Sequence, residues 1–198
     1  MSSQPAALVL EDGSVYEGES FGAQCSAYGE VVFNTSMTGY QEMLTDPSYS
    51  GQIVVPTFPL IGNYGINERD YESNRIQVSG FVVREICSEP SHSLSTSDLP
   101  SFLIEQGIPG ISGVDTRAIT RRLRSQGVMM GVIAVGESHE NALGRLNKIP
   151  RYGEVDFVSR VTTRQSYEWT QAVLYHSVLK PVNKKIVVDD YGLKYNIL

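Results

Sequence analysis

Histidine and cysteine are scarce in this sequence, which limits the chemistry that the chain can carry. Its 198 residues include two cysteines and three histidines. No two of them stand at the spacing of a metal site, and neither Cys25 nor Cys87 has the flanking glycines of a nucleophile elbow. His92, His139 and His176 each lack a catalytic partner nearby in sequence. We therefore predict no metal site and no catalytic residue in the chain.

Basic charge and long apolar runs are also lacking. The 16 basic residues are outnumbered by 22 acidic ones, a net charge of -6, whereas a nucleic-acid binder needs clustered cations in excess. No apolar run approaches the roughly 20 residues of a membrane span, and the N-terminal MSSQPAALVL lacks the basic start of a signal peptide. These features predict a cytoplasmic globular protein that binds neither nucleic acid nor membrane.

The densest polar stretch runs from Glu30 to Ser50, EVVFNTSMTGYQEMLTDPSYS. It opens with the β-forming residues 31–33, which predict a strand. Tyr40, Met43 and Leu44 then stand at helical spacing, so a short helical turn can bury them while residues 41 and 42, Gln and Glu, face outward.

An Asp-Pro-Ser sequence predicts that a new helical turn begins after Asp46. Asp46 can cap a helical turn, and Pro47 fits the first helical position. Residues 48–50 would then sit beside free backbone donors, a setting that can receive a small polar ligand. The alternative is that these hydroxyl groups only satisfy the hydrogen bonds of their own turns. The residues alone leave both interpretations open.

The rest of the chain up to residue 150 predicts a mixed α/β domain. Asp-Gly between residues 6–10 and 15–19 indicates a β-hairpin. Capping patterns predict helices that begin after Asp98, Asp115 and Ser138. Further strands are expected at 52–58, 76–84 and 129–135. This order indicates a sheet built early in the chain, with helices laid on it later.

The predicted helix between Asp115 and Gly127 is amphipathic. Its apolar residues occupy one face, and three arginines occupy the other: Arg117, Arg121 and Arg124. This basic face is either solvated or binds an acidic surface of a partner.

The chain changes character after residue 150. Residues 151–182 have no sustained period and read as a connecting arm, anchored by Val155, Phe157, Trp169 and Leu174. Residues 186–190, IVVDD, predict a buried strand, followed by a helix beginning at Leu193. A doubly wound parallel sheet opens in this way, so we expect residues 183–198 to be the truncated start of another domain.

Four motifs together resemble one known family. They are EVVFNTSMTGYQEMLTDPSYSGQIVV, PLIGNYGIN, GVDTRAITRRLRSQG and VVDDYGLKYNIL, and they extend over nearly the whole chain. In sequence and order they resemble the small, glutamine-hydrolysing chain of carbamoyl-phosphate synthetase.

The resemblance implies a fold and a division into domains. Residues 1–150 would form the family's N-terminal domain, of the swivelling β/β/α type, and 151–182 the connecting arm. Residues 183–198 would be the first strand and helix start of a class I glutaminase domain. The nucleophile motif G-x-C-x-G-H-Q of that domain, and the rest of its Cys-His-Glu triad, are not found within these 198 residues. Cys25 and Cys87 therefore do not take the nucleophile's role.

The resemblance also implies a function and partners. In the family, glutamine is hydrolysed on the small chain, and the ammonia passes to a large chain that makes carbamoyl phosphate for arginine and pyrimidine synthesis. The serine of the D-P-S-Y motif, here Ser48, would bind glutamine from the N-terminal domain. ATP and Mg belong to the large chain, so we expect no cofactor on this chain. The alternative is a free-standing, non-catalytic binding or regulatory module on the same scaffold.

Overall fold

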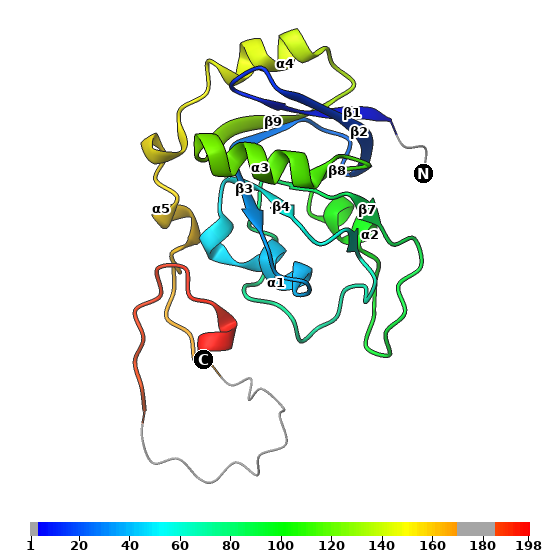
Figure 1. Cartoon of the computed structure of the whole chain (residues 1–198). Helices are drawn as coiled ribbons and strands as arrows, with labels where there is room; N and C mark the ends of the chain where they lie inside the picture. Colours follow the sequence, from blue (N-terminus) through cyan, green and yellow to red (C-terminus); the bar gives the residue numbers. More distant parts are fainter. Residues whose placement is uncertain (1–3, 170–184) are drawn as a thin grey trace.

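A closed barrel of seven strands forms the body of the molecule (Figure 1), in the order β1-β2-β8-β6-β4-β3-β9. The computed structural model describes residues 4–169 and 185–198. The barrel strands are β1 (Pro5–Leu10), β2 (Val15–Gly22), β3 (Ala27–Asn34), β4 (Gln52–Pro56), β6 (Gly80–Val82), β8 (Pro109–Ser112) and β9 (Met129–Val135). Two shorter strands, β5 (Leu60–Ile61) and β7 (Glu85–Ile86), form a separate parallel pair.

The strand pairing confirms the predicted mixed sheet and shows that the sheet closes into a barrel. β1 and β2 form the predicted antiparallel hairpin, and β1 pairs on its other side with β9. The strands β3, β4, β6 and β8 run parallel to one another, and β9 pairs antiparallel with β3. Closure into a barrel leaves no free edge among these seven strands.

Alternating side chains divide the apolar residues between the inside and the outside of the barrel. On β1, Leu8 and Leu10 point into the cluster that also holds Ile53 of β4 and Ile133 of β9. Val9 points the other way, into a smaller cluster. The first strand of the hairpin is thus the more buried one, as its composition predicts.

The helices cover the barrel and close its interior. They are α1 (Tyr40–Thr45), α2 (Leu99–Glu105), α3 (Thr116–Gln126), α4 (His139–Leu146) and α5 (Val158–Val161). α3 contributes Ile119 and Leu123 to the interior cluster, whereas α4 covers the smaller cluster around Val9. The outer cluster beside α1 and α2 includes Val54 of β4.

The three predicted helix caps are confirmed. The carboxylate of Asp98 accepts from the amide of Ser101 at 2.7 Å, and that of Asp115 accepts from Ala118 at 2.9 Å. The hydroxyl of Ser138 accepts from the amide of Asn141 at 3.3 Å. The predicted strand at 76–84 is shorter than expected and covers only β6. Ile76 and Val78 are buried without strand pairing, because they fill the outer cluster under α1 and α2.

The strand expected at residues 186–190 was a wrong prediction for this structure. These residues form no strand, and Ile186 and Val187 are 83% and 84% exposed. A parallel strand needs a neighbour to pair with, and within the described residues none lies beside this segment. In place of a helix from Leu193 there is a short 3-10 turn, η3 (Tyr195–Ile197). Leu174 and His176 lie outside the described residues.

Within the described ranges, 4–169 and 185–198, no helix is long and apolar enough to cross a bilayer.

Candidate functional site

The candidate site lies in the connection between two parallel neighbours, β3 and β4. Parallel strands cannot be joined by a tight turn, so the chain must cross from the end of one strand to the start of the next. Residues 35–51 make this crossing and contain α1 and the 3-10 turn η1 (Pro47–Tyr49). We call this segment the crossover corner. Ser48 lies in η1 and is exposed.

Tyr64 caps the start of the crossover corner. α1 begins after Gly39, which supplies no side-chain cap. In its place the hydroxyl of Tyr64 accepts from the amides of Gly39 at 3.1 Å and Tyr40 at 2.9 Å. The rings of Tyr40 and Tyr64 stack at 4.1 Å, and the Tyr40 hydroxyl donates to the carbonyl of Gly65 at 2.6 Å. Burial raises the pKa of Tyr64 to about 12, so its hydroxyl stays neutral.

Gln41 and Glu42 do not face outward, which corrects the sequence prediction. Gln41 is fully buried, where its amide group donates to the carbonyl of Asn67 at 2.6 Å and accepts from the Asn67 amide at 2.9 Å. Glu42 is half-buried, and desolvation raises the pKa of its carboxyl, aided by the charges of Asp70 and Glu72. The charged composition of residues 67–75 predicts a surface segment, but the backbone of Asn67 supplies both partners of the buried Gln41 side chain.

Thr45 joins the end of α1 to the loop that follows β5. Its hydroxyl donates to the carbonyl of Gln41 and accepts from the amide of Glu72, each at 2.9 Å. The hydroxyl of Ser73 donates to the Thr45 carbonyl at 2.5 Å. These bonds are all internal, so Thr45 has a structural role.

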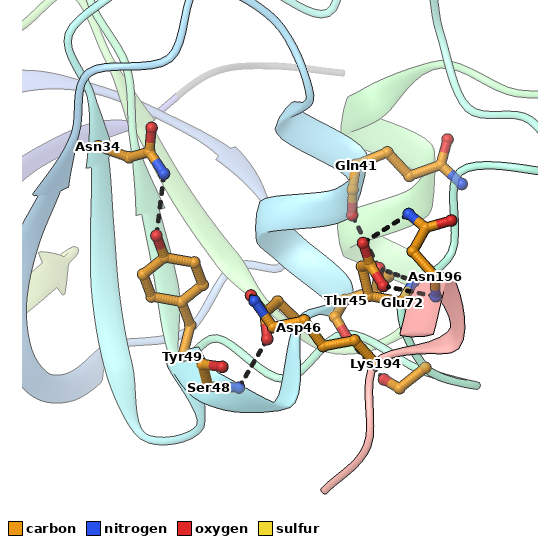
Figure 2. Close-up of polar contacts among 10 residues, drawn as sticks. Asn34, Gln41, Thr45, Asp46, Ser48, Tyr49, Glu72, Lys194 and Asn196 are labelled. Atoms are coloured by element: carbon orange, nitrogen blue, oxygen red, sulfur yellow. Dashed lines mark hydrogen bonds and ion pairs between the residues drawn. The ribbon is translucent and has the colours of Figure 1, made fainter. Parts of the chain in front are cut away.

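Asp46 caps η1 as predicted and also holds a distant lysine. One carboxylate oxygen, Oδ1, accepts from the amide of Ser48 at 2.8 Å, and Pro47 takes the first helical position. The other oxygen, Oδ2, lies 2.6 Å from Nζ of Lys194. Figure 2 shows both contacts on the single carboxylate. The hydrogen bond between Lys194 and Asp46 raises the pKa of Lys194.

Ser48 differs from Asp46 and Tyr49 in that its side chain has no partner among the described residues. The hydroxyl of Tyr49 accepts from the side-chain amide of Asn34 at 2.9 Å, and the carbonyl of Ser50 accepts from the hydroxyl of Tyr152 at 3.1 Å. The Ser48 hydroxyl makes no hydrogen bond to any described residue, although its amide is capped. Asp46 and Tyr49 therefore satisfy their own corner, whereas Ser48 presents an exposed hydroxyl beside them. The hydroxyl groups of Thr35, Ser36, Thr38 and Ser50 likewise make no hydrogen bond within the described residues.

The C-terminal segment returns to this corner. Nδ2 of Asn196 donates to Glu72 at 2.7 Å, and the Asn196 backbone amide donates to the same carboxylate at 3.2 Å (Figure 2). The amide of Tyr195 donates to the carbonyl of Glu72 at 3.0 Å. The Tyr195 ring packs against Trp169, with centroids 4.6 Å apart. Residues 194–196 are thus fixed on the loop that also supports α1.

A polar cleft of about 640 Å³ lies beside the corner. It is lined by Pro47, Ser73, Arg75, Arg160, Arg164 and Leu193, among others. The connecting arm forms its wall, because α5 packs there and the carbonyl of Arg160 accepts from the Arg75 side chain at 3.2 Å. Phe157, one of the predicted arm anchors, stacks on Tyr152 with centroids 4.6 Å apart.

The remaining candidate residues lie outside the crossover corner. Cys25 is exposed, and desolvation raises the pKa of its thiol, which is the wrong direction for a nucleophile. No group of three metal-ligating side chains forms among the described residues. On α3 the arginines 117, 121 and 124 are exposed. A fourth, Arg122, pairs with Asp12 at 2.6 Å.

Comparison with known proteins decides the family. Residues 8–133 match the model of the carbamoyl-phosphate synthase small chain, CPSase domain. The chain belongs to this family. That match includes five of the seven barrel strands in full, half of β1, most of β9 and the whole crossover corner.

Curated relatives, which are small chains of carbamoyl phosphate synthase, match nearly the whole chain. The small chain of Methanopyrus kandleri is 48% identical over 198 residues, which is 98% of this chain and 52% of the relative. Those of Nostoc sp. and Lawsonia intracellularis are 48% and 44% identical, with 99% and 98% of this chain covered and 53% and 54% of the relatives. The chain spans about half the length of the curated relatives that it matches.

The sequence pointed to Asp46, Pro47 and Ser48 in the crossover corner. It did not point to the residues that support them. Tyr64, Glu72 and Lys194 contact the corner from positions far along the chain. A local pattern cannot pair such residues. The one available signal was the single lysine of VVDDYGLKYNIL.

Proposed function

We propose that this chain is the N-terminal part of a glutamine-hydrolysing small chain of carbamoyl-phosphate synthetase. In this role its crossover corner contributes Ser48 to a glutamine site whose catalytic residues lie in a separate glutaminase domain. Ammonia released there passes to the large chain, which uses ATP and Mg to form carbamoyl phosphate. The complex would work in the cytoplasm.

One observation carries the role of Ser48. The nearby side chains of Asp46 and Tyr49 are both committed to internal contacts, yet the Ser48 hydroxyl is exposed and has no partner among the described residues. A capped turn holds its backbone, so little ordering is needed before the hydroxyl can bind a ligand. A hydroxyl can donate to a carboxylate or accept from an ammonium group, and an amino acid such as glutamine offers both.

The large chain is the partner that we propose for this chain. The exposed arginines of α3 offer one candidate surface for an acidic region of that partner, and a merely solvated face is the alternative. A free-standing module has no specific support, since the relatives found are small chains of the synthetase.

The test replaces Ser48 in a complete small chain paired with its large chain. Ser48→Ala should raise the KM for glutamine about tenfold, because the lost hydrogen bond leaves a polar group of glutamine unpaired. Synthesis from free ammonia serves as the internal reference, since it bypasses glutamine. Ser93→Ala, at an exposed serine in the loop before α2, is the matched control. A glutamine KM that does not change in Ser48→Ala would contradict the proposal.

A further inference from the structure

Glu42 is a carboxylate without a hydrogen-bond partner in the crossover corner. It stands in the first turn of α1, and its Oε2 atom is buried and unpaired among the described residues. A glutamate at the third helical position usually reaches back and accepts from the amide just before the helix. Here that amide, of Gly39, donates to the hydroxyl of Tyr64 at 3.1 Å. The Glu42 carboxylate therefore lacks the partner that its position in a helix normally provides.

The titratable groups around Glu42 are acidic or neutral. Desolvation raises the pKa of its carboxyl, and the like charges of Asp70 and Glu72, from the loop after β5, add to the rise. Burial, followed by the charge of Glu42, raises the pKa of Tyr64 to about 12. Burial also raises the pKa of Tyr40 on α1 itself, so both phenols stay neutral. A negative charge on Glu42 thus faces two carboxylates and two uncharged hydroxyls.

No salt bridge relieves these three carboxylates among the described residues. Lys194 pairs with a different carboxylate. The partners that the neighbouring acids do have are neutral side-chain amides, Asn67 for Asp70 and Asn196 for Glu72. Ionisation therefore places a further negative charge among like charges, at a position partly withdrawn from water.

The contact beside this carboxylate joins α1 to the loop of residues 64–73. The Gln41 side chain exchanges two hydrogen bonds with the backbone of Asn67, at 2.6 and 2.9 Å. The hydroxyl of Thr45 accepts from a backbone amide of the same loop at 2.9 Å. Glu42 lies between Gln41 and Thr45 on the helix, so repulsion between its carboxylate and the acids of the loop acts against all of these bonds.

We propose that Glu42 is a pH-sensitive element that controls how tightly α1 packs on the 64–73 loop. Protonated Glu42 permits the closed contact, whereas ionised Glu42 weakens it. A carboxyl that binds its proton more tightly in the folded state favours folding at low pH. Its contribution is lost as the pH rises from the ordinary carboxyl pKa through the raised one. This inference goes beyond the proposed function and does not depend on glutamine binding.

The experiment follows hydrogen exchange of the Tyr40 and Asn67 amides in the full-length protein. Both amides form bonds across the contact, and comparing variants at one pH cancels the intrinsic exchange rate. Glu42→Gln should slow both exchange rates about tenfold near pH 8, the factor that one unit of pKa represents, and the difference should shrink towards pH 5. The matched control is Glu140→Gln, which changes an exposed glutamate in the first turn of α4.

Asp70→Asn provides a second, independent variant. It removes one of the like charges that face Glu42 and keeps the shape of the side chain. Because Glu72 remains, we expect slower exchange near pH 8 by a smaller factor than in Glu42→Gln.

Four results would overturn the proposal. Unchanged exchange in Glu42→Gln would mean that its charge does not act on the contact. A slowing of equal size at both pH values would mean a packing effect without titration. The same pH-dependent slowing in Glu140→Gln would assign the effect to any first-turn charge. The same factor at the amides of β9 would indicate a change in global stability and not in this contact.

Discussion

At the scale of single residues, the corner depends on hydroxyl groups supplied from elsewhere in the chain. Tyr64 is the clearest case, since its oxygen accepts from both amides at the start of α1. Serine, threonine, aspartate or asparagine usually performs this task from the residue before the helix. A sequence pattern finds such local caps, as it found Asp46, Asp98 and Asp115. It does not find a cap delivered by a side chain 24 residues away.

Tyr64→Phe should therefore destabilise the chain by about 2 kcal/mol, because two partly buried amides lose their acceptor while the stacked ring remains. Chemical denaturation measures this change in the free energy of unfolding. Tyr16→Phe is the matched control, since it removes the hydroxyl of a partly buried tyrosine that packs on the interior cluster away from α1. An equal loss in the two variants would argue against the capping role.

At the scale of elements, the arm after residue 150 packs directly on the end of the corner. Gly51 has a φ of 78°, and a Cβ there would overlap the ring of Phe157. Helices and strands with clear caps or alternation, such as α3 and β9, could be predicted almost to the residue. The segment at 186–190 could not, because an apolar run becomes a strand only where another strand is available to pair with it.

Gly51→Ala should cost about 2 kcal/mol of stability, since it combines a strained positive φ with displacement of the Phe157 ring. In the double variant Gly51→Ala with Phe157→Ala, the steric part of this cost should disappear. The double variant should therefore lose less stability than the sum of the losses in the two single variants. Thermal unfolding of the four proteins completes the cycle. Strict additivity would mean that the arm does not pack on Gly51.

At the scale of the whole molecule, the closed barrel holds the crossover corner between two of its parallel strands, β3 and β4. Strand patterns predicted a mixed sheet, yet closure depends on β9 pairing with both β1 and β3, a long-range choice that no local pattern specifies. The family resemblance supplied Ser48. The ion pair between Asp46 and Lys194 could be found only in the folded chain.

The pure 198-residue chain should release no ammonia from glutamine, because neither cysteine has the setting of a nucleophile. An ammonia assay on protein whose fold is verified by circular dichroism tests this expectation. The same assay on the small chain with its glutaminase domain provides the positive control. Glutamine-dependent release by the pure chain that is abolished in Ser48→Ala would refute it.

The parallel register of β3 and β4 places a limit on how the crossover corner can evolve. Val31 lies opposite Ile53, and Phe33 lies opposite Val55. Ile53 and Val55 face the interior, whereas Val54 faces outward. Deleting or inserting one residue between 35 and 51 would either move Ser48 or shift β4 by one position, and a one-position shift turns every side chain of a strand to the opposite face. We therefore expect the length of this corner to tolerate change far less than its surface residues do.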